Sequence, residues 1–286
     1  MLNLILAIIA SSLVSIMMRI GENRVKNNIS MLSVNYIICG IFAVYYTGVH
    51  NLMKTREGIE IALGLGLFNG FIYIASLIFF QNSVKYNGLI LSSIFMKLGI
   101  MVPLIISVLF FHEIPTFVQG IGFTIAITAM ILMNLKDKDK SEKLDIIKKK
   151  RMYKVKLIFV LLGCGLADGM SKIYRELGTV EYEELFLVIT FWISFIFSLV
   201  LVKYKKQIYT KNEIIYGVFL GIPNYFSARF LLKALGEVPA VVAYPIFSVG
   251  TIAVITLIGV LFFREKLNRR QMFAIALIMV AVALLN

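Results

Sequence analysis

The sequence predicts an all-α membrane protein whose ten transmembrane helices form two inverted five-helix repeats. First, ten apolar stretches follow one another along the 286 residues, and a helix needs about 20 apolar residues to cross a bilayer. Second, hydrophobic residues make up 59% of the chain and the mean hydropathy is +0.88, more than a soluble domain of this length needs. Third, the last five stretches repeat features of the first five. The stretches lie at 2–19, 31–49, 58–80, 87–111, 117–135, 155–174, 185–202, 213–234, 238–262 and 270–285.

Each stretch is interpreted as one spanning helix, because the connections between the stretches are short. The first, at 2–19, has no basic segment before it and no small-residue cleavage site after it, so we expect a spanning helix and not a signal peptide. The fourth, at 87–111, contains Pro103, which should break that helix. Cys39 and Cys164 lie singly inside apolar stretches, so we expect inert thiols and neither a disulfide framework nor a metal site.

A local repeat is the strongest sign of an internal duplication. The run Leu-Phe-Phe-His-Glu at 109–113 recurs as Leu-Phe-Phe-Arg-Glu at 261–265. The same spacing places Tyr73, in the middle of the third stretch, on Tyr225 in the eighth. Because each half holds an odd number of spans, the halves must insert with opposite orientations, which is the arrangement of alternating-access transporters with inverted repeats.

The two halves also carry a family pattern, since each ends in Leu-Phe-Phe-x-Glu followed by an apolar fifth helix. The relevant segments run from Phe80 to Glu113 and from Leu232 to Glu265. The pattern resembles paired EamA-type domains of the drug/metabolite transporter superfamily, and the resemblance covers essentially the whole chain. It implies a secondary transporter with a central cavity between the halves, lined mainly by the first four helices of each. Relatives carry amino acids, drugs, sugars, nucleotide sugars or phosphorylated metabolites, so the pattern does not specify a substrate.

The resemblance and the repeat together divide the chain into three parts. Residues 1–135 form a first EamA-like five-helix repeat, and residues 157–286 form the second. Between them, residues 136–156 are highly charged and show no apolar periodicity, so we expect a solvated linker.

The basic residues predict the orientation of the chain in the membrane. Most of the Lys and Arg residues that flank the spans lie on the side of the linker, whereas the opposite side has little beyond Lys54, Arg56 and Arg175. The positive-inside rule therefore places the linker in the cytoplasm and both termini outside. The family resemblance implies cytoplasmic termini instead, and we give more weight to the charge bias of this chain. We expect a multi-pass protein of the plasma membrane, in bacteria the inner membrane.

Lys97 is the most informative charge inside a span. It lies about ten residues into the fourth stretch, which is about 15 Å deep at 1.5 Å per residue, so it cannot easily reach either interface. Charged residues within spans are costly and are functional candidates by default. Lys97 is either a cation that awaits an anionic substrate group or the structural partner of Asp168.

Asp168 is the one carboxylate placed well inside a predicted span. It could bind and release a coupling proton, or it could neutralise Lys172 one helical turn away. Lys172 and its repeat equivalent Arg19 lie near opposite faces of the membrane, where they could act as paired entrance charges or simply extend to the interface.

Other polar residues inside the spans complete the predicted site. Arg229, one turn deeper than Lys233, could offer a bidentate fork to a carboxylate or phosphate, or it could anchor the helix at the interface. Polar tips on apolar bodies suit a cavity, although Asn can also join helices. The further candidates for a substrate-binding set are Asn69, Tyr73, Asn224, Tyr225, Ser92, Ser93 and Tyr244.

The excess of positive charge within the membrane favours an anionic substrate. Lys97, Lys172 and Arg229 stand against Asp168, so we expect a secondary transporter of a small metabolite that carries a carboxylate or phosphate, such as an amino acid, an organic acid or a phosphorylated metabolite. Proton coupling through Asp168 is part of this expectation. The alternatives are an exporter of organic cations or drugs, and a lipid flippase on the same fold.

Other classes are excluded by what the sequence lacks. The net charge of +13 comes from residues beside helix ends and forms no basic groove, so a nucleic-acid partner is not expected. His50 and His112 lie far apart and no catalytic motif is present, so we expect no enzyme activity, no cofactor and no metal. The expected partners are the substrate and the lipid bilayer, with the protein a monomer or homodimer.

Overall fold

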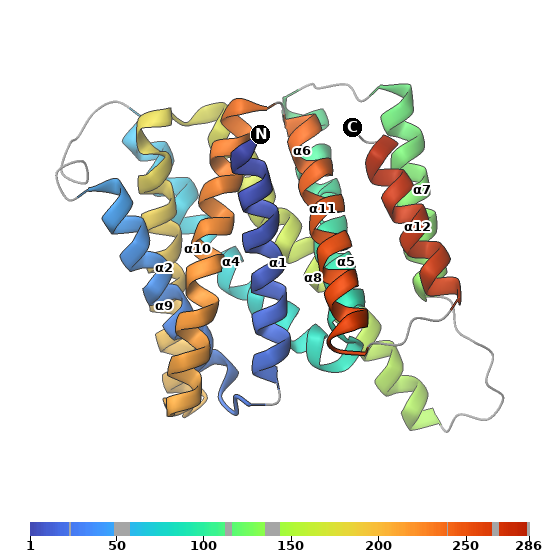
Figure 1. Ribbon diagram of the computed structural model, residues 1–286. Helices are drawn as coiled ribbons and strands as arrows, with labels where there is room; N and C mark the ends of the chain where they lie inside the picture. The colour runs from blue at the N-terminus through green and yellow to red at the C-terminus, as the bar shows by residue number, and fades with distance from the viewer. Residues whose placement is uncertain are drawn as a thin grey trace.

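The computed structural model describes residues 1–22, 24–48, 58–111, 116–134, 144–238, 240–264 and 269–284. These residues form a bundle of roughly parallel and antiparallel helices, with both termini at the same end (Figure 1). In chain order the elements are α1 (Leu2–Glu22), α2 (Asn28–Thr47), α4 (Ile59–Asn87), α5 (Leu89–Leu98), α6 (Met101–Phe110), α7 (Phe117–Asn134), α8 (Leu144–Leu177), a 3-10 turn (Val180–Tyr182), α9 (Glu183–Tyr204), α10 (Lys211–Glu237), α11 (Ala240–Leu261) and α12 (Arg269–Leu284).

Membrane-spanning character is clear in this bundle. Among the described residues, seven helical segments are long and apolar enough to cross a bilayer, and the parts of α11 and α12 at Ile246–Leu261 and Met272–Ala281 are shorter apolar helices. Large apolar side chains such as Phe68, Phe71 and Phe219 stand exposed on the outside of the bundle, as expected for helices that face lipid. The prediction of an all-α membrane protein is therefore confirmed.

The fourth predicted span is not one helix from 87 to 111 but two, because the chain breaks between α5 and α6. Pro103 has no N–H to donate to the carbonyl of Gly99, and the amide of Val102 bonds that carbonyl instead, at 2.8 Å. The break also lies against α8, where a Cβ added to Gly99 would come within 2.8 Å of the backbone oxygen of Leu161. A proline and a close backbone approach thus combine to interrupt the helix beside Lys97.

The charged segment at 136–156 is helical over the part of it that the structure describes. Its residues up to 143 lie outside the described part of the chain, but α8 begins at Leu144 and continues without interruption to Leu177. The segment was expected to be a solvated connector because it lacks apolar periodicity. Lys and Arg are nevertheless good helix formers, so a basic segment can extend a spanning helix into water.

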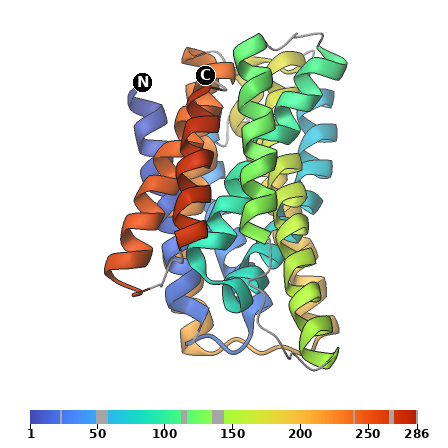
Figure 2. The same cartoon turned by 90° about the vertical axis from the view of Figure 1, so that its right-hand side faces the viewer.

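The two halves of the chain pack into each other. The most extensive contacts join α2 with α9, α4 with α8, α1 with α10, α2 with α10, α4 with α9 and α7 with α12, and each pair takes one helix from either half. Figures 1 and 2 show α7 and α12 side by side at one edge of the bundle. Glycines let the central helices approach closely, since a Cβ on Gly70 would lie 2.8 Å from the backbone of Thr190, and one on Gly221 would lie 2.8 Å from that of Asn35.

Candidate functional site

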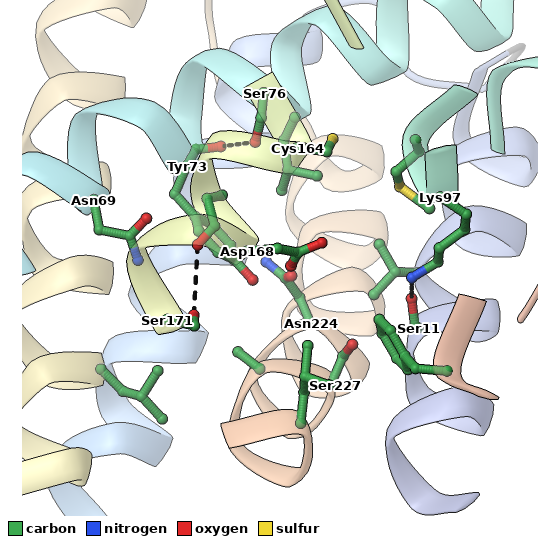
Figure 3. Close-up of a pocket in the computed structure, with 18 residues that line it drawn as sticks. Ser11, Asn69, Tyr73, Ser76, Lys97, Cys164, Asp168, Ser171, Asn224 and Ser227 are labelled. Atoms are coloured by element: carbon green, nitrogen blue, oxygen red, sulfur yellow. Dashed lines mark hydrogen bonds between the residues drawn. The ribbon is translucent and has the colours of Figure 1, made fainter. Parts of the chain in front are cut away.

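A cavity of about 80 Å³, lined by both polar and apolar side chains, lies between helices of the two halves (Figure 3). A water molecule needs about 10–15 Å³ measured in this way, so the cavity has room for several waters or a small solute. Helices α1, α4 and α5 contribute from the first half, and α8, α9, α10 and α11 contribute from the second. Its polar lining consists of Ser11, Asn69, Tyr73, Ser76, Lys97, Cys164, Asp168, Ser171, Asn224 and Ser227.

Lys97 enters the cavity from the last turn of α5, just before the helix break. Its ammonium donates a hydrogen bond to Ser11 Oγ at 2.9 Å and lies 3.6 Å from the centroid of the Phe247 ring. The residue is only 6% exposed. A hydroxyl, an aromatic face and the C-terminal end of a helix dipole all favour a cation, but none of them carries a full negative charge.

Asp168 faces the same cavity from α8. Its backbone carbonyl accepts a hydrogen bond from Tyr244 Oη at 2.9 Å, while its carboxylate points into the cavity (Figure 3). Within the described part of the chain, that carboxylate makes neither a hydrogen bond nor an ion pair. The structural ion pair with Lys97 that the sequence left open is therefore not formed here.

Lys172 does not neutralise Asp168 either, so the second pairing that the sequence left open is not formed here. Its ammonium instead contacts Glu176 Oε1 at 2.5 Å, one turn nearer the end of α8. Glu176 is 37% exposed, so an ion pair with it requires less desolvation than one with a carboxylate deep in the bundle.

Three neutral candidates line the cavity, namely Asn69, Tyr73 and Asn224. The Asn224 amide donates to Asn35 Oδ1 at 3.1 Å and so ties α10 to α2. The Asn69 amide is 3.5 Å from Thr190 Oγ1, and its buried Oδ1 has no partner among the described residues. Because buried polar atoms are almost always hydrogen-bonded, this free acceptor favours an additional polar group in the cavity.

Arg229 and Tyr225 belong to a separate cluster that does not line the cavity. Arg229 Nε donates to Glu184 Oε1 at 2.6 Å, and Tyr225 Oη donates to the other oxygen of the same carboxylate at 3.1 Å. The guanidinium also lies 3.9 Å from the centroid of the Tyr46 ring. The arginine fork predicted for a substrate anion is thus occupied by a carboxylate of the protein itself.

The remaining candidates also lie away from the cavity. Ser92 Oγ is 2.8 Å from Ser83 Oγ, and Ser93 Oγ is buried with no hydrogen-bond partner in the part of the chain that the structure describes. Tyr244 does not line the cavity but reaches its edge, where its hydroxyl donates a hydrogen bond to the backbone carbonyl of Asp168. Arg19 pairs with Glu22 near the end of α1.

Sequence reasoning missed several residues that line the cavity. Ser11, Ser76, Ser171, Ser227, Cys164 and Phe247 were not predicted. A usable signal existed for some of them. Cys164, Asp168 and Ser171 follow one another at i, i+4 and i+7 on α8, and Asn69, Tyr73 and Ser76 do the same on α4. A polar stripe of helical period inside an apolar span predicts a face turned away from lipid.

A bundle of membrane-spanning helices around a polar, charged cavity is the architecture of a polytopic membrane transporter. The chain matches the model of the EamA-like transporter family over residues 1–135 and 156–286, and it belongs to that family. The resemblance to paired EamA-type domains is thereby confirmed.

Two further comparisons found proteins that are similar to this chain in sequence or in fold. An uncharacterised protein of Haemophilus influenzae (strain ATCC 51907 / DSM 11121 / KW20 / Rd) is 25% identical over 279 residues, which cover 93% of this chain and 91% of that protein. A crystal structure of another protein shares the fold, with a TM-score of 0.62 and 14% identity, over 99% of this chain and 94% of that one.

Proposed function

We propose that this protein is a secondary active transporter that moves a small metabolite with a carboxylate or phosphate group through the central cavity. The observation that carries the proposal is the Lys97 ammonium, which faces the cavity and forms no ion pair among the described residues. A buried charge without a counter-charge is expensive, so an incoming anion would be attracted there. Ser11 and Phe247 hold the ammonium in the conformation described here.

The helix packing supports two inverted repeats, with residues 1–135 and 157–286 as the repeats and 136–156 between them. If the halves are exchanged, the pairs α1–α10 and α4–α8 change places, as do α2–α10 and α4–α9, whereas α2–α9 and α7–α12 map onto themselves. This is the pattern that a two-fold axis between the halves would produce. Inverted halves can rock around a fixed site and expose it to either side in turn, which is alternating access.

The positions of Arg19 and Lys172 fit entrance charges in such a cycle. Arg19 lies in the last turn of α1 and Lys172 lies in the turn before the last of α8, and these repeat-equivalent helices end at opposite sides of the bundle. Each is paired with a carboxylate on its own helix, Glu22 or Glu176, in the conformation described here. We propose that these pairs exchange partners as the two ends open and close.

A carrier of organic cations is the second candidate, and one observation favours it. The Asp168 carboxylate also faces the cavity without a hydrogen bond or ion pair among the described residues, and Tyr73 lines the same space. A cation would be drawn to such a carboxylate beside an aromatic ring.

A transport assay separates these candidates. We expect purified protein in liposomes to accelerate exchange of a labelled amino acid, organic acid or phosphorylated metabolite, and the same compound to raise the melting temperature in detergent. Protein-free liposomes are the control. Exchange of organic cations alone, such as tetraethylammonium, would contradict the proposal and favour the second candidate.

The charge bias predicts that the basic end of the bundle faces the cytoplasm. Lys205, after α9, lies at this end and Val180, before α9, lies at the other, and both are exposed. In a background with Cys39→Ala and Cys164→Ser, we expect Val180→Cys to react with a membrane-impermeant maleimide in intact bacteria. Lys205→Cys should react only after the membrane is permeabilised, and the opposite pattern would reverse the orientation.

A further inference from the structure

Two opposite charges face the central cavity, and the structure keeps them apart. Lys97 approaches from α5 and Asp168 from α8, and no ion pair or hydrogen bond joins their side chains. Figure 3 shows the Asp168 carboxylate among the labelled lining side chains and the Lys97 ammonium to one side of them, beside Ser11. Both groups line the same cavity of about 80 Å³. Each therefore offers a full charge to whatever enters.

The separation follows from the contacts of the Lys97 ammonium and from the position of the α8 backbone. The Lys97 ammonium is directed toward α1 and α11 by Ser11 and Phe247. Asp168 is placed by α8, which packs its backbone against the helix break, since a Cβ on Gly99 would lie 2.9 Å from the amide nitrogen of Gly165. Tyr244 fixes the same segment of α8 through the Asp168 carbonyl. Bringing the ammonium to Asp168 would require it to leave Ser11 and Phe247.

Resting on the proposed function, we infer that the substrate is a small zwitterion, with an anionic group that binds Lys97 and an ammonium group that binds Asp168. A simple anion at Lys97 would bring a second negative charge next to Asp168, and a simple cation at Asp168 would meet Lys97. A molecule that carries both charges a few bonds apart satisfies both residues at once and adds no net charge to a buried site.

The rest of the lining fits a compact zwitterion. Asn69 Oδ1 is a buried acceptor without a partner in the described residues and can accept from an ammonium, while Asn224 and Ser227 offer further polar atoms. Val14, Leu77 and Leu187 form an apolar part of the wall that would accommodate a short side chain. An α-amino acid has these features together, and so has any other small compound with adjacent ammonium and carboxylate groups.

The test compares each L-amino acid that has an uncharged side chain with its N-acetyl derivative, which retains only the negative charge, and with its amide, which retains only the positive charge. Melting temperatures of the purified full-length protein are measured with each compound at equal concentration. We expect at least one free amino acid to raise the melting temperature by several degrees, and its two derivatives to have no effect.

Two variants should each change the preferred ligand from the free amino acid to one of its singly charged derivatives. Lys97→Met removes the charge that repels a cation, so we expect it to lose the response to the free amino acid and gain one to the amide. Asp168→Asn should lose the first response and gain one to the N-acetyl compound. Lys233→Met, the same substitution outside the cavity, should behave as the wild type does. A variant that gains binding of a new compound must be folded. If either variant does not fold, the comparison of free amino acids with their two derivatives on wild-type protein decides whether the substrate is a zwitterion.

Three outcomes would overturn the inference. If the N-acetyl derivatives bind wild-type protein as well as the free amino acids do, an anion suffices and the proposed function stands without the zwitterion. If only the amides bind, both the zwitterion and the anionic substrate are wrong. If no amino acid and no derivative shifts the melting temperature, the inference fails, whereas a shift caused by an organic acid or sugar phosphate would still support the proposed function.

Discussion

Lys97→Met is expected to remove transport while it leaves the protein folded. The substitution keeps the length and the apolar stem of the side chain but deletes the ammonium that faces the cavity. A hydrogen bond to a charged group contributes about 1.5–3 kcal/mol, so binding of the anionic substrate should weaken about 10- to 100-fold. Exchange in liposomes, measured below saturation, should fall by the same factor.

The stability of this variant should not fall with its activity. The ammonium is stabilised only by a hydroxyl, an aromatic ring and a helix end, and an apolar replacement of a buried charge is often neutral or stabilising. We therefore expect the melting temperature to stay within about 2 °C of the wild type or to rise.

The alternative role of Lys97 gives a different and recognisable result. If Lys97→Met unfolds the protein, Lys97 acts as the structural partner of Asp168, and the double variant Lys97→Met with Asp168→Asn should then fold again. If exchange of the anionic metabolite survives Lys97→Met intact, the anion site is wrong, and a neutral or cationic substrate becomes the better hypothesis.

Most of the fold could be predicted from the sequence, because the hydropathy of a segment indicates a spanning helix without reference to distant residues. An apolar stretch of about 20 residues can only be satisfied as a spanning helix, whatever its neighbours are. The sequence could predict that the fourth span is broken but not where the break lies. Pro103 predicts an interruption, but its position at the α5–α6 junction also depends on contact of Gly99 with α8, more than sixty residues further along the chain.

The sequence could predict those site residues that are unusual by themselves, namely polar or charged residues deep in an apolar span. A charge or amide deep in a span demands an explanation, and the structure brings Lys97, Asp168, Asn69, Tyr73 and Asn224 to one cavity. The sequence could not predict which of the charged residues within the spans form ion pairs with one another.

Arg229 illustrates that limit most clearly. In the sequence it is another cation within a span, and we gave it the same possible role as Lys97. The difference between them is Glu184, which stands at the start of α9 and meets Arg229 only after α9 and α10 have packed. Arg229 and Glu184 are 45 residues apart and lie on different helices, so helical periodicity in the sequence cannot predict their contact.

Arg229→Met is therefore expected to destabilise the protein, in contrast to Lys97→Met. It would leave the Glu184 carboxylate, 20% exposed, with the Tyr225 hydroxyl as its remaining hydrogen-bond donor among the described residues. It would also remove the guanidinium from the face of Tyr46. Removing one partner of a buried pair costs about 3–5 kcal/mol, and because this pair is partly exposed we expect about 2 kcal/mol, or a fall of about 4–8 °C in melting temperature.

A double-mutant cycle shows whether that loss arises from the ion pair. Glu184→Gln keeps an acceptor for Tyr225 but removes the negative charge, so combining it with Arg229→Met should recover most of the lost stability. Arg229→Lys is the matched control, since it keeps the charge but loses the planar fork and should be destabilised less. If Arg229→Met instead keeps its melting temperature and loses transport as Lys97→Met does, Arg229 reaches the substrate during the transport cycle. The ion pair with Glu184 would then be a resting arrangement that the substrate replaces.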